Sequence, residues 1–164
     1  MTTLILRTIL TAASAISIST SMPLRASGRS DEVFSLHGAC SSMRVGPKNL
    51  TRYCQGKLVS FTTANGRVGF IFMIGKEGIL QFSGAGTKQT RLPGERASQP
   101  IDKVRLTLAE TAPEAEVTSV GTGRCVYGNP FSGTSNISCR VSSGRGLFLA
   151  EFVTDGSAPE RAGY

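Results

Sequence analysis

The chain has 164 residues, a formal net charge of +7, 19 glycines, four cysteines and no tryptophan. This length suits one domain with an apolar core of its own. The absence of any run of strong helix formers, with many short apolar stretches between glycine-containing turns, argues against a helical fold and favours an all-β one.

Residues 1–26 have the layout of a secretory signal peptide. One early cation, Arg7, precedes a short run of apolar and small residues at 8–18, and polar residues follow. A membrane anchor would need about 20 apolar residues, and serine and threonine interrupt this run too often. We therefore predict a signal peptide over 1–26, a periplasmic or secreted location, and a single β-rich domain over 27–164 without a transmembrane helix.

The four cysteines form two loops of matched spacing. Cys40 and Cys54 enclose thirteen residues, and so do Cys125 and Cys139. An even number of cysteines behind an export signal predicts disulfides. The local pairs Cys40–Cys54 and Cys125–Cys139 are favoured over the cross-loop pairings because each would clip adjacent strands or one loop. A zinc site is disfavoured because structural zinc ligands usually come in close pairs, and no other metal or cofactor is expected.

The predicted elements are about eight β-strands. In chain order they are residues 27–37, 58–64, 67–74, 79–83, 101–110, 114–127, 136–142 and 146–154. The first is expected to be an edge strand. The second and third form a hairpin whose two-residue turn is Asn65-Gly66, because both residue types accept positive φ. From Val104 onward the apolar residues alternate with a period of two, which favours a strand over a helix.

Two segments are expected to be irregular: residues 41–53, which hold Gly46-Pro47, and residues 84–100, which are rich in glycine and proline. The last two strands are expected to pair across residues 143–145. The whole pattern predicts a small antiparallel sandwich or barrel stapled by two disulfides. The two halves also resemble each other, since each has a cysteine loop, a hairpin and an apolar strand. Duplication and chance both explain this, because glycine, serine and threonine are so common here.

No catalytic site stands out in the sequence. His37 is the only histidine, so any mechanism with a histidine base must use it, and it lies beside a cysteine expected to be oxidised. A lone histidine is more often a surface or loop residue than a base. Acidic residues are scattered without a recognisable setting: Glu77, Asp102, Glu110, Glu151 and Asp155. We therefore expect no enzymatic activity, and the alternative is a small secreted hydrolase or enzyme inhibitor with an unrecognised site.

The positive charge is unevenly distributed. Residues 38–92 carry eight cations and one acid, whereas residues 93–164 carry seven cations and eight acids. Such a field can attract anionic partners. The candidate anion-binding residues are Arg44, Lys48, Arg52 and Lys57. The alternative is a solvated basic surface that keeps the protein soluble.

The partner suggested by this charge is an anionic envelope component, either a lipid headgroup or a polymer, or else a protein. Nucleic acid is disfavoured, because Tyr53 is the only aromatic residue near the cations and the phenylalanines are expected in the core. The sequence thus predicts an exported, non-catalytic β-domain with a binding or structural role in the cell envelope or extracellular space.

Overall fold

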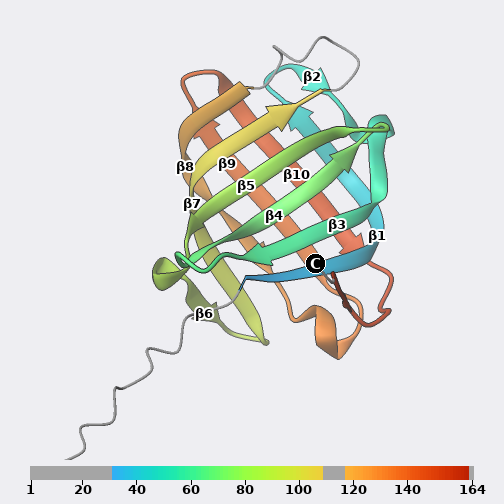
Figure 1. The fold of residues 1–164 in the computed structure, drawn as a ribbon. Coiled ribbons are helices and arrows are strands. Elements are labelled where there is room, and N and C mark those ends of the chain that lie inside the picture. The colour runs from blue at the N-terminus through green and yellow to red at the C-terminus, as the bar shows by residue number, and fades with distance from the viewer. Residues whose placement is uncertain (1–30, 109–116, 163–164) are drawn as a thin grey trace, which may run out of the picture.

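The protein is a closed antiparallel β-barrel (Figure 1). This computed structural model describes residues 31–108 and 117–162. The barrel strands, in chain order, are β1 (Glu32–Val45), β3 (Cys54–Thr62), β4 (Arg67–Ile74), β5 (Gly78–Ala85), β7 (Arg96–Thr107), β8 (Val117–Tyr127), β9 (Asn136–Ser143) and β10 (Gly146–Thr154). The predicted all-β antiparallel fold of about eight long strands is confirmed, and of the two expected architectures it is the barrel.

Short elements decorate the barrel. The additional strands are β2 (Lys48–Asn49), β6 (Thr90–Leu92) and β11 (Glu160–Arg161), and the single 3-10 turns are η1 (Thr51–Tyr53), η2 (Gly86–Lys88) and η3 (Pro130–Ser132). Within the described ranges no helix has the length and apolar character needed to cross a membrane.

Strand β1 closes the barrel. It pairs with β3 along one side and with β10 along the other, from Gly38 opposite Thr154 to Val45 opposite Phe148. The register shifts between Cys40 and Ser42, within the pairing with β10, as expected of a β-bulge. The edge position predicted for the strand at 27–37, of which residues 27–30 lie outside the described residues, is therefore wrong for its described part, and so is the irregular conformation expected for residues 41–45. That stretch becomes a strand because β10 supplies hydrogen-bonding partners that the local sequence does not reveal.

The barrel interior is filled by side chains from alternate positions of the strands. On β4, Phe70, Phe72 and Ile74 are buried, whereas the residues between them are half-buried. Phe72 packs edge-on against Phe82 of β5 at 5.7 Å and against Phe152 of β10 at 6.5 Å between ring centroids. Full burial of such a side chain contributes about 1.5–3 kcal/mol, so this aromatic centre is a main source of stability.

The hairpin between β3 and β4 forms as predicted, but its turn is longer than two residues. The Gly66 N–H donates to the Thr63 oxygen, and the Thr63 N–H donates to the Arg67 oxygen. Only Gly66, at φ 78°, has a positive φ in this turn. The prediction of positive φ at both Asn65 and Gly66 is therefore wrong, whereas the β9–β10 hairpin turns at residues 144–145 as expected.

The segment 84–100, predicted to be loop-like, is largely strand. β5 continues to Ala85, β6 lies within the segment, and β7 begins at Arg96. Pro100 is tolerated inside β7 because of its place between two partners. Along β7, pairing with β6 ends at Ser98 and pairing with β5 begins at Lys103. Pro100 lies in the gap between these two pairings, where its oxygen faces Gly84 of β5. The missing N–H of proline therefore breaks no ladder there.

Both predicted disulfides are confirmed. Cys40–Cys54 joins β1 to β3, and Cys125–Cys139 joins directly opposite positions of β8 and β9 inside the barrel. Two disulfides are compatible with an extracellular or periplasmic protein. The signal peptide at 1–26 and the ends of two predicted strands at 109–116 lie outside the described residues, and the resemblance of the two halves stays a prediction.

Candidate functional site

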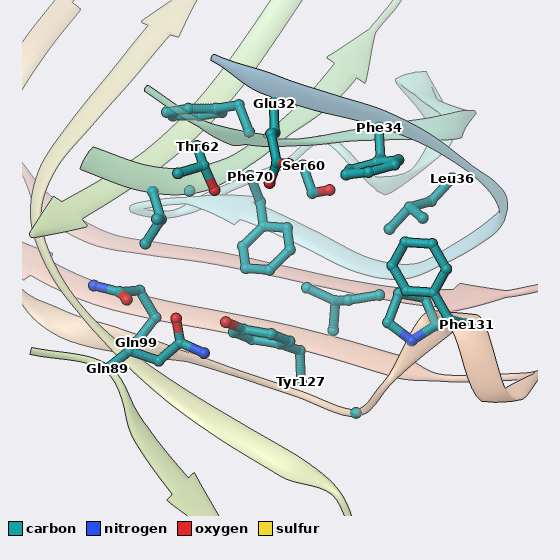
Figure 2. Close-up of a pocket in the computed structure, with 16 residues that line it drawn as sticks. Glu32, Phe34, Leu36, Ser60, Thr62, Phe70, Gln89, Gln99, Tyr127 and Phe131 are labelled. Carbon is teal, nitrogen blue, oxygen red and sulfur yellow. The ribbon is translucent and has the colours of Figure 1, made fainter. Parts of the chain in front are cut away.

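One end of the barrel holds a pocket of about 170 Å³, which we call the mouth pocket (Figure 2). It exists because the inward side chains become small near this end. Along β3, buried Leu58 is followed at inward positions by Ser60 and Thr62, and on β5 the inward position after Phe82 is Gly84. The aromatic centre thus fills the middle of the barrel and leaves its mouth hollow. A cavity of about 150 Å³ can hold benzene, so this pocket has room for one ring-sized group.

Five aromatic residues line the mouth pocket: Phe34, Phe61, Phe70, Tyr127 and Phe131. Phe70 and Tyr127 meet edge to face at 4.9 Å, and Phe34 and Phe131 do so at 5.4 Å. Phe131 lies on η3, where its N–H donates to the Asn129 Oδ1 at 3.1 Å, and it is 62% exposed. The prediction that the phenylalanines belong to the core is wrong for Phe131, which forms part of the rim.

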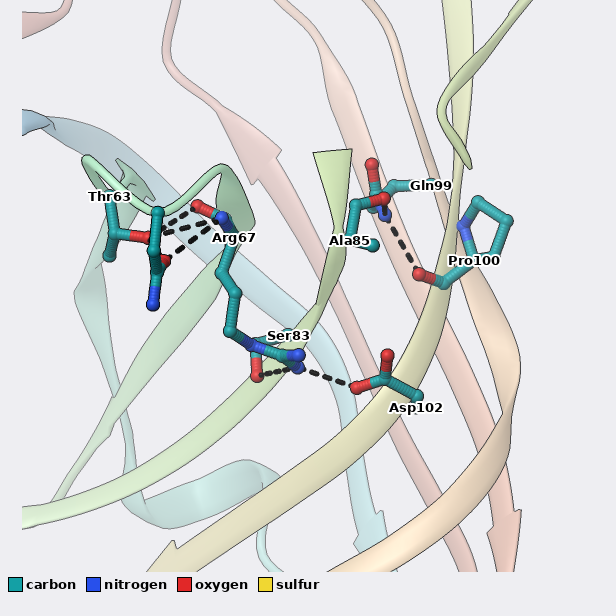
Figure 3. A network of polar contacts seen from close by, with 8 residues as sticks. Thr63, Arg67, Ser83, Ala85, Gln99, Pro100 and Asp102 are labelled. Carbon is teal, nitrogen blue, oxygen red and sulfur yellow. Dashed lines mark hydrogen bonds and ion pairs between the residues drawn. The ribbon is translucent and has the colours of Figure 1, made fainter. Parts of the chain in front are cut away.

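Gln99 is the most unusual polar residue of the pocket. Its side chain is fully buried, and its Nε2 donates to the Ala85 oxygen at 3.0 Å and to the Pro100 oxygen at 2.8 Å (Figure 3). Because both partners are carbonyl acceptors, only the amide nitrogen can face them. Oε1 must therefore point the other way, and it has no hydrogen-bond partner among the described residues. An unpaired buried acceptor costs about 1–3 kcal/mol, so a donor that reached Oε1 would be stabilised.

Tyr127 and Gln89 lie next to Gln99 in the pocket (Figure 2). Burial raises the pKa of the Tyr127 hydroxyl above its usual value, and a hydrogen bond with the Gln89 side chain offsets part of that effect. The hydroxyl is therefore neutral near pH 7, and this side of the pocket combines an aromatic face with amide and hydroxyl groups.

Glu32 brings a carboxylate to the outer edge of the pocket. It lies opposite Thr62 in the β1–β3 register and 3.5 Å from the Arg161 guanidinium. Both side chains are at least half exposed, so the pair contributes little to stability. Among the described residues that line the pocket, Glu32 is the only charged one.

The predicted anion-binding residues lie away from this pocket. Arg44, Lys48 and Arg52, which we call the basic cluster, are exposed around β2 and η1 at the opposite end of the barrel (Figure 1). Arg52 also stacks on the Tyr53 ring at 4.6 Å. Lys57 is exposed on β3 opposite His37, seven residues before Arg44 along β1, and therefore about 20 Å from Arg44. The structure thus brings together three of the four predicted residues.

His37 lies on the outer face of β1. Its Nε2 is 3.6 Å from a Glu160 carboxylate oxygen, and Asp155 follows β10 nearby, where its N–H donates to the His37 oxygen. Hydrogen bonds from Ser157 lower the pKa of the Asp155 carboxyl. None of these three residues lines the mouth pocket.

Of the scattered acidic residues, Glu110 lies outside the described residues, and Asp102 has a structural partner. Asp102 forms an ion pair with Arg67 at 2.5 Å, and Arg67 also donates to the Ser83 Oγ at 3.0 Å, which fastens β4, β5 and β7 together on the outer face (Figure 3). Within residues 31–108 and 117–162, no group of three or more histidine, cysteine or acidic side chains is placed to hold a metal ion.

Comparisons with protein-family models, with curated proteins and with solved structures give no match to this chain. The mouth pocket and its chemistry are therefore the basis on which a function can be argued.

Proposed function

We propose that the protein is an exported, non-catalytic binding protein that holds a small, mainly apolar ligand in the mouth pocket. The observation that carries the proposal is Gln99, a pocket-lining residue whose buried Oε1 has no partner among the described residues, within a lining that is mainly aromatic, aliphatic and small apart from Glu32 and Gln89. A few directed polar groups in an apolar hollow are typical of small-ligand sites.

The scaffold supports this function. An eight-stranded barrel is just wide enough to be filled by side chains or to hold one small ligand at its end. Here Phe72 and Phe82 fill the centre, and Cys125–Cys139 clips β8 to β9 on the inner side. The pocket walls are thus held in place before a ligand arrives, which reduces the entropic cost of binding.

The test is a binding screen on the purified protein with ring-sized compounds, namely toluene, phenol, benzyl alcohol and benzylamine. Binding would be followed by thermal shift and by NMR chemical-shift changes. We expect at least one compound with an N–H or O–H donor to bind more tightly than toluene. Failure of all four to bind at millimolar concentration would refute the proposed function.

A matched pair of variants localises the binding. Ser60 lies inward between Phe34 and Phe70, whereas its neighbour Val59 faces the outside of the same strand. Ser60→Phe should fill the mouth pocket and abolish binding, and Val59→Phe should leave binding intact. Equal binding by both variants would place the ligand elsewhere.

A second candidate function is contact with an anionic envelope component through the basic cluster. The observation that favours it is that Arg44, Lys48 and Arg52 lie together, exposed, and form no ion pair with another described residue. Reversal of all three to glutamate should weaken retention on vesicles with acidic lipids and on an anionic polymer column.

The control for this second candidate is a reversal of equal charge at the other end of the barrel, at Lys88, Arg91 and Arg96, which are also exposed. If both triple variants lose retention equally, net charge alone explains the binding, and the basic cluster is not a site. Lys57→Glu should have a smaller effect, because that residue lies apart from the cluster.

A further inference from the structure

We propose that the ligand of the mouth pocket is a small amine that binds as an ammonium cation attached to a ring-sized apolar body. This inference rests on the proposed function and adds the chemical class of the ligand. It is drawn from the charge and the aromatic rings of the pocket, which favour a cation, and from its hydrogen-bonding capacity, which favours a donor.

The charge of the lining is opposite to that of the chain. The whole sequence has 18 lysines and arginines against 11 acids, yet no described lining residue is a cation and Glu32 contributes a carboxylate. A ligand with a carboxylate or phosphate would meet Glu32 without any compensating charge in the pocket. Anionic ligands are therefore disfavoured, and an ammonium group is favoured.

The aromatic rings of the pocket also favour an ammonium group. Phe34 lies two residues after Glu32 on β1 and meets Phe131 edge to face, and Phe70 and Tyr127 form a second pair of rings in the pocket (Figure 2). Ring faces carry partial negative charge and attract ammonium groups. A carboxylate beside several rings is thus suited to hold a cation at the mouth while the apolar body enters the barrel.

The hydrogen-bonding capacity of Gln99 also selects a donor. Both amide hydrogens of Gln99 are committed to the Ala85 and Pro100 oxygens, so the side chain offers a ligand only its Oε1 acceptor. An N–H or O–H group on the ligand body can satisfy this oxygen, whereas a carbonyl or ether group cannot. Gln99 therefore favours ligands that carry a hydrogen-bond donor over ligands that only accept hydrogen bonds.

Arg161 is the internal competitor for the cation site. Its guanidinium lies 3.5 Å from Glu32 and does not line the pocket. Because both side chains are exposed, the pair is weak and a ligand ammonium can take the place of the guanidinium. Removal of the Arg161 charge should therefore increase the affinity for an amine.

The test compares three compounds of the same size that differ in charge at pH 7: benzylamine, benzyl alcohol and benzoate. Affinities for the purified protein would be measured by NMR titration or calorimetry. We expect benzylamine to bind about tenfold more tightly than benzyl alcohol and benzoate to bind most weakly. If benzyl alcohol or benzoate binds as tightly as benzylamine, the amine inference is overturned while the proposed function stands. If none binds, the proposed function itself fails.

Two substitutions remove one negative charge each from neighbouring places. Glu32→Gln should reduce the preference for benzylamine over benzyl alcohol about fivefold, because an exposed ion pair is worth roughly that factor. Glu160→Gln is the matched control, since Glu160 faces His37 on the outer surface and not the pocket. Arg161→Gln should raise the benzylamine affinity. Equal effects of the two glutamate variants, or no gain with Arg161→Gln, would overturn the role of Glu32.

Discussion

The two disulfides close loops of equal length, so a difference between their contributions to stability must come from something other than loop length. Each bridge spans a sequence separation of 14, so the loop-closure model gives both about 3 kcal/mol. They differ in burial, because Cys125 and Cys139 are both 0% exposed, whereas Cys40 and Cys54 are half-buried. Replacement of each pair by alanine should therefore destabilise the protein by different amounts.

The difference comes from the packing around the sulfur atoms. Removal of one buried heavy atom costs about 0.5–1.5 kcal/mol, so the double variant C125A/C139A loses about 1–3 kcal/mol beyond the loop term. We expect it to lose about 4–6 kcal/mol in total, against about 3 kcal/mol for C40A/C54A, where solvent or neighbouring side chains can fill the space.

The assay is equilibrium unfolding in urea, followed by circular dichroism, for the oxidised wild type and both double variants. The free energies are compared rather than the midpoints, because loss of a bridge expands the unfolded chain and changes the slope. Equal losses, or a larger loss for C40A/C54A, would refute the argument that burial of the Cys125–Cys139 bridge inside the barrel adds to its stabilising effect.

Further substitutions test the packing and ionisation of the barrel. Phe72→Ala should lower the free energy of unfolding by about 3–5 kcal/mol, because the ring is fully buried, and a loss under about 1 kcal/mol in urea unfolding would contradict this. Gly84→Ala should cost about 1–3 kcal/mol, since its Cβ would lie 2.0 Å from the Pro100 oxygen, whereas Gly144→Ala meets nothing within 4 Å and should match the wild type in thermal unfolding. Burial raises the Tyr127 pKa above 10.0, so above that pH the unfolded chain loses this proton first and stability falls. Tyr127→Phe should lessen that fall in thermal unfolding at alkaline pH, and an identical pH dependence in both proteins would contradict it.

The strands that the sequence predicts best are those with one buried face and one more exposed face. On β10 and on β7 from Val104 onward, buried and more exposed residues alternate strictly, because the barrel interior is dry and its outside is wet. The same contrast explains why the β9–β10 hairpin was predictable. Low helical content follows from the composition, and three short 3-10 turns are all the helical structure of the described residues.

The strands that the sequence misses depend on distant partners. Residues 41–45 have no strong strand pattern of their own, yet β10 pairs with them. Pro93-Gly94 and Pro100 are typical of loops, and the gap between β6 and β5 is what makes Pro100 acceptable within a strand. Tertiary pairing thus overrides local preference at both places.

The mouth pocket could not be predicted from sequence, because its lining comes from six strands and two connecting segments that meet only when the barrel closes. Gln99 lies in a glycine- and proline-rich stretch that predicts a loop, and the absence of a partner for its Oε1 is a property of the folded state. One sequence signal was present: Phe131 follows Asn129-Pro130, a turn signal that places it outside a strand and so outside the core.

The pairing of β1 with β10 has a consequence for the way this chain is made. Gly38 and Thr154 pair across almost the whole described sequence, whereas every other pair of neighbouring barrel strands joins barrel strands that follow one another in the chain. Such a long-range contact forms late, and until the last strand has emerged the nascent sheet has two unpaired edges. Open edges are templates for association with other chains. A fragment that stops before Gly146 should therefore aggregate, because its first and last strands would lack the partners that close the barrel.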